Sequence, residues 1–362
     1  MRISVLSILL ALGLCAVAGC GKKEKGEARE PVISEDGTSS AHVVRIGGKE
    51  HMVRDGEQVG GKYDRLMKPV YSSDGRSLGV TGKSDGKWTV SKDGRQVGGA
   101  YKRSGNPVLS RDGRSVAHTA KIGGKWCVVK DGTPLEGRYD GVGQPAFSSG
   151  GESIAFSAWT GDKAFIVKDG AKCSRDYDAT WQPGFGPSGK SIAFVAARGD
   201  KQFLVKEGVR VGGEYLRIWA WTFSPDGRSV AFVAMVGDDS FLVKDGKPAG
   251  SRFRAEDVRA PVFGPDGSSV AFAARDGAQW FVMKDGAQAG ERFEADDVRK
   301  PILSPNGSSV ALWAARGRRW FIVKDGVPQG DTYRRPSKLQ TSDDGASLTF
   351  QTVAGTSVTI PW

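Results

Sequence analysis

Cysteine and histidine are both scarce, with four cysteines and three histidines among the 362 residues. Cys15 and Cys20 lie near the N-terminus, so only Cys127 and Cys173 remain for the rest of the chain. This count excludes a disulfide-rich scaffold, and the spacing matches no zinc motif. A single disulfide between Cys127 and Cys173 stays open, because the sequence does not supply the Cα separation that such a bond needs. We expect no metal and no other cofactor.

The N-terminus carries an apolar run at residues 3–17 that is too short to span a bilayer comfortably. It ends in Val17-Ala18-Gly19-Cys20, which resembles a bacterial lipobox. The resemblance implies that residues 1–19 are a lipoprotein signal peptide and that Cys20 is acylated. Glycine instead of aspartate at position 21 implies sorting to the outer membrane. An ordinary secretory signal with an incidental cysteine is the alternative.

Residues 20–30 are mostly charged, so we expect a lipidated Cys20 followed by a flexible tether. The whole chain has a formal net charge of +11, which favours acidic partners or membrane surfaces. The basic residues are scattered and form no long run. We therefore expect no nucleic-acid partner, and we expect a monomeric domain attached to the membrane through its lipid.

Glycine is abundant, with 51 residues, and its spacing reveals a repeat of 38 residues that lengthens to 40 twice. One set of turns contains Gly37, Gly75, Gly113, Gly151, Gly189, Gly227, Gly267, Gly307 and Gly345; a second contains Gly56, Gly94, Gly132, Gly170, Gly208, Gly246, Gly286 and Gly326. Short apolar runs at this period predict an all-β fold, a single β-propeller of four-stranded blades over residues 31–362. Eight repeats are full. Residues 339–362 supply three strands of a ninth, so eight or nine blades are possible.

One repeat, residues 222–259, illustrates the expected blade. A short first strand at 222–224 is followed by strands at 229–234 and 240–243, an outer strand around 251–253 and a longer link to the next blade. Asp-Gly pairs supply the positive φ values of the tight turns between strands. The second and third strands are apolar at consecutive positions, which indicates sheets buried on both faces and therefore stacked repeats.

The motif Ser224-Pro225-Asp226-Gly227, followed by Ser229-Val230-Ala231-Phe232, is similar to the WD-like repeats of TolB-type propellers. The resemblance covers residues 31–362. It implies a protein of the bacterial envelope that binds protein partners. This chain differs from that family in carrying its own lipid site, in having more repeats and in lacking an N-terminal α/β domain, so a role in the same envelope complex does not follow.

Aligning the repeats with one another places all three histidines at positions that other repeats fill with core residues. His42 and His118 align with Phe156 and Phe232, and His51 aligns with Phe165. We therefore expect packing histidines, no catalytic residue and no enzyme.

The links between repeats differ from one another and hold the candidate site. Trp181, Trp219, Arg259 and Arg299 occupy one position on four consecutive links, and Trp221 lies beside Trp219. Tryptophan and arginine dominate the energetics of protein interfaces, so these five residues are the predicted partner-binding patch. The alternative is that the tryptophans fill the channel mouth and the arginines pair with neighbouring acids.

The sequence therefore predicts a lipid-anchored envelope β-propeller, located in the periplasm or facing outward, that acts as a non-enzymatic scaffold for a protein or peptide. A propeller that binds carbohydrate or a small ligand through the same tryptophans is the alternative function.

Overall fold

The computed structural model describes residues 27–35, 37–334, 336–342, 344–352 and 356–362. The expected signal peptide at residues 1–19 and the expected lipid site at Cys20 lie outside these residues. The chain divides into two compact units, Met1–Phe185 and Gly186–Trp362. The residues described contain no helix that is long and apolar enough to cross a membrane.

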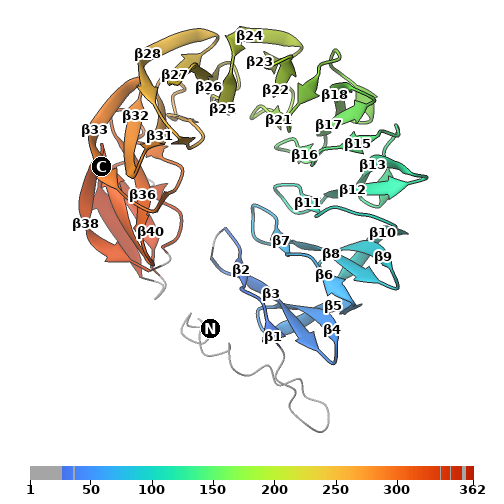
Figure 1. The fold of residues 1–362 in the computed structure, drawn as a ribbon. Coiled ribbons are helices and arrows are strands. Elements are labelled where there is room, and N and C mark those ends of the chain that lie inside the picture. Colours follow the sequence, from blue (N-terminus) through green and yellow to red (C-terminus); the bar gives the residue numbers. More distant parts are fainter. Residues whose placement is uncertain (1–26, 36, 335, 343, 353–355) are drawn as a thin grey trace. The chain divides into compact units, whose positions relative to one another are not determined.

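The described strands form nine antiparallel sheets, numbered here in chain order (Figure 1). Unit 1 holds sheets 1–4 together with β20 and β21, and unit 2 holds β22–β24 and sheets 6–9. The ninth sheet has three strands, as the repeat predicts.

Second strands lie in the middle of each sheet and are mostly apolar. They are β3 (Ser40–Ile46), β8 (Leu78–Ser84), β12 (Val116–Ile122), β17 (Ile154–Thr160), β22 (Ile192–Arg198), β26 (Val230–Val236), β31 (Val270–Asp276), β36 (Val310–Arg316) and β40 (Ser347–Gln351). Third strands follow after a two-residue turn in sheets 1–8. They are β4 (Lys49–Arg54), β9 (Lys87–Lys92), β13 (Lys125–Lys130), β18 (Lys163–Lys168), β23 (Lys201–Lys206), β27 (Asp239–Lys244), β32 (Gln279–Lys284), β37 (Arg319–Lys324) and β41 (Ser357–Pro361).

Fourth strands begin directly after the Asp-Gly turn, earlier than the sequence predicts. They are β5 (Glu57–Tyr63), β10 (Arg95–Tyr101), β14 (Thr133–Pro134), β19 (Ala171–Lys172), β24 (Val209–Tyr215), β28 (Lys247–Arg254), β33 (Ala287–Glu294) and β38 (Val327–Tyr333). The turn fixes this start, because Asp245 and Gly246 adopt φ values of 49° and 81° and form a tight hairpin.

First strands are mostly broken into two short pieces, both paired with the second strand. They are β1 (Glu27–Ala28) with β2 (Val32–Ile33), β6 (Arg65–Leu66) with β7 (Val70–Tyr71), β15 (Gly141–Val142) with β16 (Ala146–Phe147), β20 (Ala179–Thr180) with β21 (Gly184–Phe185), β29 (Asp257–Val258) with β30 (Val262–Phe263), and β34 (Asp297–Val298) with β35 (Ile302–Leu303); β11 (Val108–Leu109), β25 (Arg217–Phe223) and β39 (Gln340–Thr341) are single pieces. The sequence predicts a longer link between one repeat and the next. In the structure, most of these links contain the first piece of the next first strand.

The tether is also shorter than expected. Glu27 and Ala28 form β1 and pair with β3, and Arg29 binds the buried carboxylate of Glu50 at 2.5 Å. The first sheet therefore takes up residues 27–29, which the sequence assigned to a flexible segment, because β1 supplies the first-strand piece that a link supplies elsewhere. No described residue of this segment joins the last sheet.

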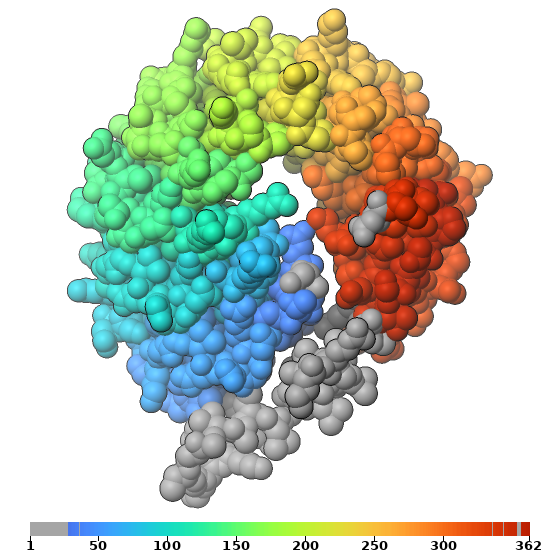
Figure 2. All heavy atoms as spheres, turned by 180° about the vertical axis from the view of Figure 1, so that it is seen from behind, coloured from blue at the N-terminus to red at the C-terminus, as the bar shows by residue number. Residues whose placement is uncertain are grey.

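The core lies between neighbouring sheets, because most second strands are buried on both faces. Phe232 on β26 packs with Val195 and Leu204 of the preceding strands, whereas Val233 packs toward Phe272 of the next sheet. Figure 1 shows the first strands β7, β11 and β16 side by side along one edge of unit 1, and these neighbours are in contact. In Figure 2 the successive sheets of unit 1, coloured blue to green, are packed in contact with one another.

Lysines of the Lys-Asp-Gly turns join neighbouring sheets, a role that sequence reasoning missed. The amine of Lys244 donates to the carbonyl of Ser268 at 2.5 Å and lies 5.5 Å from the ring centre of Phe263. Lys206 makes the same pair of contacts with Arg228 and Phe223. These lysines therefore do more than solubilise the turns.

Candidate partner-binding site

The first strand of sheet 6, β25, differs from most others in being continuous. In sheets 1–5, 7 and 8 the strand is interrupted at a proline, which has no N–H to give to the ladder. These prolines are Pro31, Pro69, Pro107, Pro145, Pro183, Pro261 and Pro301. Sheet 6 has Trp221 at this position, so β25 pairs with β26 from Arg217 to Phe223 and bulges only at Trp219.

Trp219 is held firmly at the bulge. Its indole N–H donates to the hydroxyl of Ser240 at 3.1 Å, and the Arg217 guanidinium lies 3.9 Å from its ring centre. Trp221 is also half-buried and meets Phe223 edge-on, with 5.7 Å between ring centres. Both rings are therefore fixed in orientation while part of each stays open to solvent.

Two exposed apolar residues that the sequence reasoning missed adjoin these tryptophans. Leu216 and Val236 are 41% and 42% exposed, and each is the chain neighbour of one member of the cross-strand pair Arg217–Met235. The Leu216 N–H donates to the Met235 carbonyl at 2.9 Å. We call the group formed by Leu216, Arg217, Trp219 and Val236 the β25 corner.

The repeat contained a signal for this corner. The position of Leu216 holds an acid in five other repeats, and these acids are Asp64, Asp140, Asp178, Glu256 and Asp296. An exposed leucine at a position that is otherwise acidic loses solubility without gaining core packing, which is typical of a contact surface.

The two arginines of the predicted patch are engaged with neighbouring segments. Arg259 pairs with Asp257 at 3.2 Å and with Asp297 at 2.5 Å. Arg299 donates to the carbonyls of Pro336 and Ser337 at 3.0 and 3.3 Å. Burial lowers the pKa of the Arg299 guanidinium. Their contacts among the described residues do not include Trp219 or Trp221.

Each arginine also covers a tryptophan. The Arg259 guanidinium lies 4.9 Å from the ring centre of Trp280, and that of Arg299 lies 4.3 Å from the ring centre of Trp320. The structure therefore gives both arginines a role in joining sheets 7, 8 and 9.

Trp181 lies in unit 1 between β20 and β21, and 44% of it is exposed. The structure does not place it relative to the residues of unit 2. It is the most exposed of the three predicted tryptophans and offers an open indole face.

The histidines occupy packing positions, as the alignment of repeats predicts. His118 and His51 are 1% and 6% exposed, and His42 is half-buried. The Nδ1 atom of His118 is hydrogen-bonded to the Ser104 hydroxyl at 2.9 Å. Burial lowers the pKa of His118 to about 4, so this ring is neutral at physiological pH.

The two domain cysteines are free thiols. Cys127 is buried on β13, whereas Cys173 is exposed directly after β19. Burial raises the pKa of the Cys127 thiol. Over the described part of the chain, no three His, Cys, Asp or Glu side chains are grouped so that they could hold a metal ion.

No family model and no curated protein matches this chain. Among solved structures, a eukaryotic initiation factor is similar over 88% of this chain and 93% of its own, with 13% identity and a TM-score of 0.55. The Dos1 propeller is similar over 83% of this chain and 92% of its own, with 12% identity and a TM-score of 0.46.

The likeness to the initiation factor, together with the nine antiparallel sheets, shows the fold. The chain is an all-β propeller, which confirms the prediction from the repeat. At such low identity the likeness carries no information on function.

Proposed function

We propose that the chain is a non-enzymatic scaffold that binds a protein or peptide partner through the β25 corner. The observation that carries this proposal is the exposure of Leu216 and Val236, which flank the pair Arg217–Met235, with Leu216 at a position where five other repeats place an acid. A partner that covers Leu216 and Val236 removes apolar surface from water, which is the main driving force of association.

The neighbouring aromatic residue supports the same surface. Trp219 is oriented by Ser240 and stacked under Arg217 before any partner arrives, so little side-chain entropy is lost on binding. Tryptophan and arginine beside an apolar centre form the usual arrangement of an interface hot spot. Trp221 packs against the other face of sheet 6, with Phe232 and Phe223, and so lies outside the β25 corner.

Arg259 and Arg299 contribute to the proposed site in a different way from that predicted by the sequence. Both bind neighbouring segments, so in this proposal they keep sheets 7, 8 and 9 rigid rather than touching the partner. Trp181 belongs to unit 1 and is not part of the β25 corner.

The cellular location forms part of the proposal. The lipobox-like sequence before Cys20 and the resemblance to TolB-type propellers favour a lipoprotein of the outer membrane whose partner is another envelope protein or a peptide. The packed positions of the three histidines support a binding role rather than catalysis.

The proposal is tested with Leu216→Asp, which restores the acid found in other repeats and leaves the core untouched. Val209→Asp is the matched control. Val209 is 68% exposed in the same unit and begins β24, whereas Leu216 follows the other end of that strand. Partners are captured by crosslinking in cells that make the full chain, and their affinity is then measured with the purified variants.

We expect Leu216→Asp to lower the affinity for the captured partner at least tenfold, which is about 1.4 kcal/mol of binding free energy. We expect the affinity of Val209→Asp to stay close to that of the parent protein. Equal affinity for all three proteins would overturn the site.

A carbohydrate ligand is the second candidate function, and the exposed indole of Trp181 is the observation that favours it. Indole faces bind sugar rings by stacking, and Trp159, also in unit 1, is 41% exposed. Binding to an envelope glycan on an array that disappears in Trp181→Ala but persists in Leu216→Asp would favour this candidate over the scaffold.

A further inference from the structure

An acid at the start of most first strands caps the turn between the second and third strands of its sheet. The Asp64 carboxylate accepts a hydrogen bond from the Lys49 amine at 2.5 Å and another from the Asp85 main-chain N–H at 3.1 Å. Lys49 belongs to the preceding sheet and Asp85 to the turn after β8. The carboxylate therefore joins two neighbouring sheets.

The same arrangement recurs elsewhere in both units. Asp140 accepts from the Lys125 amine and from the Gly161 N–H, the latter at 2.8 Å. Asp296 accepts from the Gly317 N–H at 2.5 Å. These bonds lower the pKa of Asp64 and Asp140, which shows that the position stabilises a negative charge.

Sheet 3 lacks this carboxylate, because Lys102 stands where the other repeats have the acid. The turn itself is retained. Gly123, its first residue, has a φ of 57°, close to the 50° of Asp85 and the 61° of Gly161. The Gly123 N–H is therefore presented in the same way, and no described residue accepts a hydrogen bond from it.

A lysine of the preceding sheet is left unpaired by the same change. Lys87 begins β9 at the position that Lys49, Lys125 and Lys163 hold in their strands, and those three lysines each pair with an acid. The acid that would pair with Lys87 belongs to the first strand of sheet 3, and the cation Lys102 occupies that position. No ion pair with Lys87 is found among the described residues.

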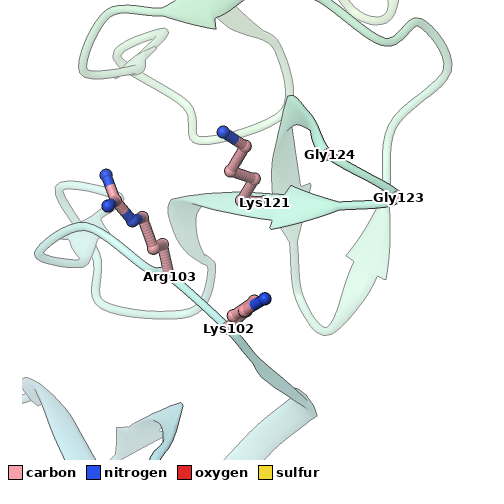
Figure 3. Close-up of a pocket in the computed structure, with 5 residues that line it drawn as sticks. All are labelled: Lys102, Arg103, Lys121, Gly123 and Gly124. Atoms are coloured by element: carbon pink, nitrogen blue, oxygen red, sulfur yellow. The ribbon is translucent and has the colours of Figure 1, made fainter.

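A pocket of about 390 Å³ lies at this point of unit 1. It is lined by Lys102, Arg103, Lys121, Gly123 and Gly124 (Figure 3). In Figure 3 Arg103 and Lys121 project to one side, while the Lys102 amine lies below β12 on the side of the turn glycines. The lining contains three cations and no acid.

The pocket is open to a ligand from outside. A Cβ atom added at Gly123 or Gly124 would meet no atom within 4 Å, so the turn faces open space. Within the described residues Lys102, Arg103 and Lys121 have no acidic partner. The Lys121 amine lies 6.0 Å from the ring centre of Trp126.

We propose that this pocket binds a carboxylate of an acidic peptide ligand in the place that an aspartate of the chain fills in the other sheets. The ligand carboxylate accepts from the Gly123 N–H and from the Lys87 amine, as Asp64 accepts from Asp85 and Lys49. Lys102, Arg103 and Lys121 add positive charge for neighbouring acidic groups of the peptide.

The choice of a carboxylate over a phosphate follows from the internal templates. In sheets 2 and 4 the site holds a carboxylate with one main-chain N–H and one lysine amine, and in sheet 5 the Asp178 carboxylate pairs with the Lys163 amine. This pocket lies in unit 1 and shares no residue with the β25 corner. The inference therefore goes beyond the proposed function and does not depend on it.

The test uses a fluorescently labelled peptide of five glutamates and the purified protein. Binding is measured by fluorescence anisotropy, and the amide resonance of Gly123 is followed by NMR during the titration. In Lys102→Asp the chain supplies its own carboxylate to Gly123 and Lys87 and so competes with the ligand. Lys190→Asp is the control, because it makes the same change of charge at an exposed position in unit 2.

We expect the Gly123 amide to shift with added peptide in the parent protein. We expect Lys102→Asp to lower the affinity at least tenfold and Lys190→Asp to change it less than twofold. Lys102→Asp introduces a residue that sheets 2, 4 and 8 already tolerate, and Arg103→Gln provides a milder variant that should weaken binding severalfold.

Three results would overturn the proposal. The first is unchanged affinity in both Lys102→Asp and Arg103→Gln. The second is an equal loss in Lys190→Asp, which would mean attraction by net charge alone. The third is displacement of the peptide by inorganic phosphate at a lower concentration than by acetate, which would reassign the pocket to phosphate groups.

Discussion

The aspartate of the Lys-Asp-Gly turn can be tested by substitution in both directions, because one full repeat has a glutamate in its place. In unit 2 the carboxylate of Asp245 accepts a hydrogen bond from the Val230 main-chain N–H at 2.8 Å. Seven sheets contain such a bond, made by Asp55, Asp93, Asp131, Asp169, Asp245, Asp285 and Asp325. Glu207 occupies the position in the remaining full repeat with the same φ of 50°.

Glu207 makes no such bond with the Ile192 N–H among the described residues, since its extra methylene carries the carboxylate past the donor. A hydrogen bond from an N–H to a charged acceptor contributes about 1.5–3 kcal/mol when buried and less when half-exposed. Aspartate also tolerates positive φ better than glutamate, by a few tenths of a kcal/mol.

We therefore expect Glu207→Asp to stabilise the protein by about 1 kcal/mol and Asp245→Glu to destabilise it by about 2 kcal/mol. Both changes keep the charge, so long-range electrostatics do not contribute. The assay is urea unfolding of the purified protein, with hydrogen exchange of the Ile192 and Val230 amides as the local measurement.

The reasoning would be refuted if Glu207→Asp proved neutral or destabilising while exchange at Ile192 stayed unchanged. A loss of stability in Asp245→Glu without faster exchange at Val230 would also contradict it, because the cost would then come from elsewhere in the turn.

Three further predictions concern unit 1. Because burial lowers the pKa of His118 from 6.5 to about 4, the unfolded chain binds the proton first, and up to about 3 kcal/mol of stability should be lost as the pH falls from 6.5 to 4. Replacing His118 with Phe should flatten that part of a pH series of urea midpoints, and an unchanged slope would contradict the assignment. In Gly82→Ala the new Cβ would lie 2.3 Å from Cδ1 of Tyr63, so overpacking should cost about 1–3 kcal/mol in urea unfolding, and no loss would show that the Tyr63 ring moves freely. Cys173 should react with a maleimide in the folded protein and Cys127 only after unfolding, as peptide mass spectrometry would show; a Cys127–Cys173 disulfide would leave neither reactive.

The repeat made the sheets predictable, because apolar runs between Asp-Gly turns determine the second and third strands almost residue by residue. Residues 230–236 and 239–244 form strands where 229–234 and 240–243 are expected. The histidines were predictable for the same reason, since the repeat shows which neighbours share their environment.

The links were not predictable from local pattern. Whether such a segment is free or joins the first strand depends on pairing with residues of the second strand farther along the chain, as between Asp257 and Arg275. The sequence suggested that Arg259 was available to a partner, but its two acids come from its own first strand and the next sheet.

Leu216 could have been found from the sequence, because the aligned repeats reveal an apolar residue among acids. Comparing every position of the repeat, rather than the tryptophan position alone, also reveals that Lys102 replaces an acid. The sequence does not show that this replacement leaves the Gly123 N–H without an acceptor, because that follows only from the geometry of the turn.

The central claim is that departures from the repeat mark the surfaces that bind, and site-directed photocrosslinking tests it most directly. A photoreactive residue is placed singly at positions 216, 236, 209 and 327 of the full chain, all of which carry exposed apolar side chains in unit 2. The account predicts that positions 216 and 236 capture the same partner and that 209 and 327 capture none. Capture from 209 and 327 with none from 216 and 236 would contradict it.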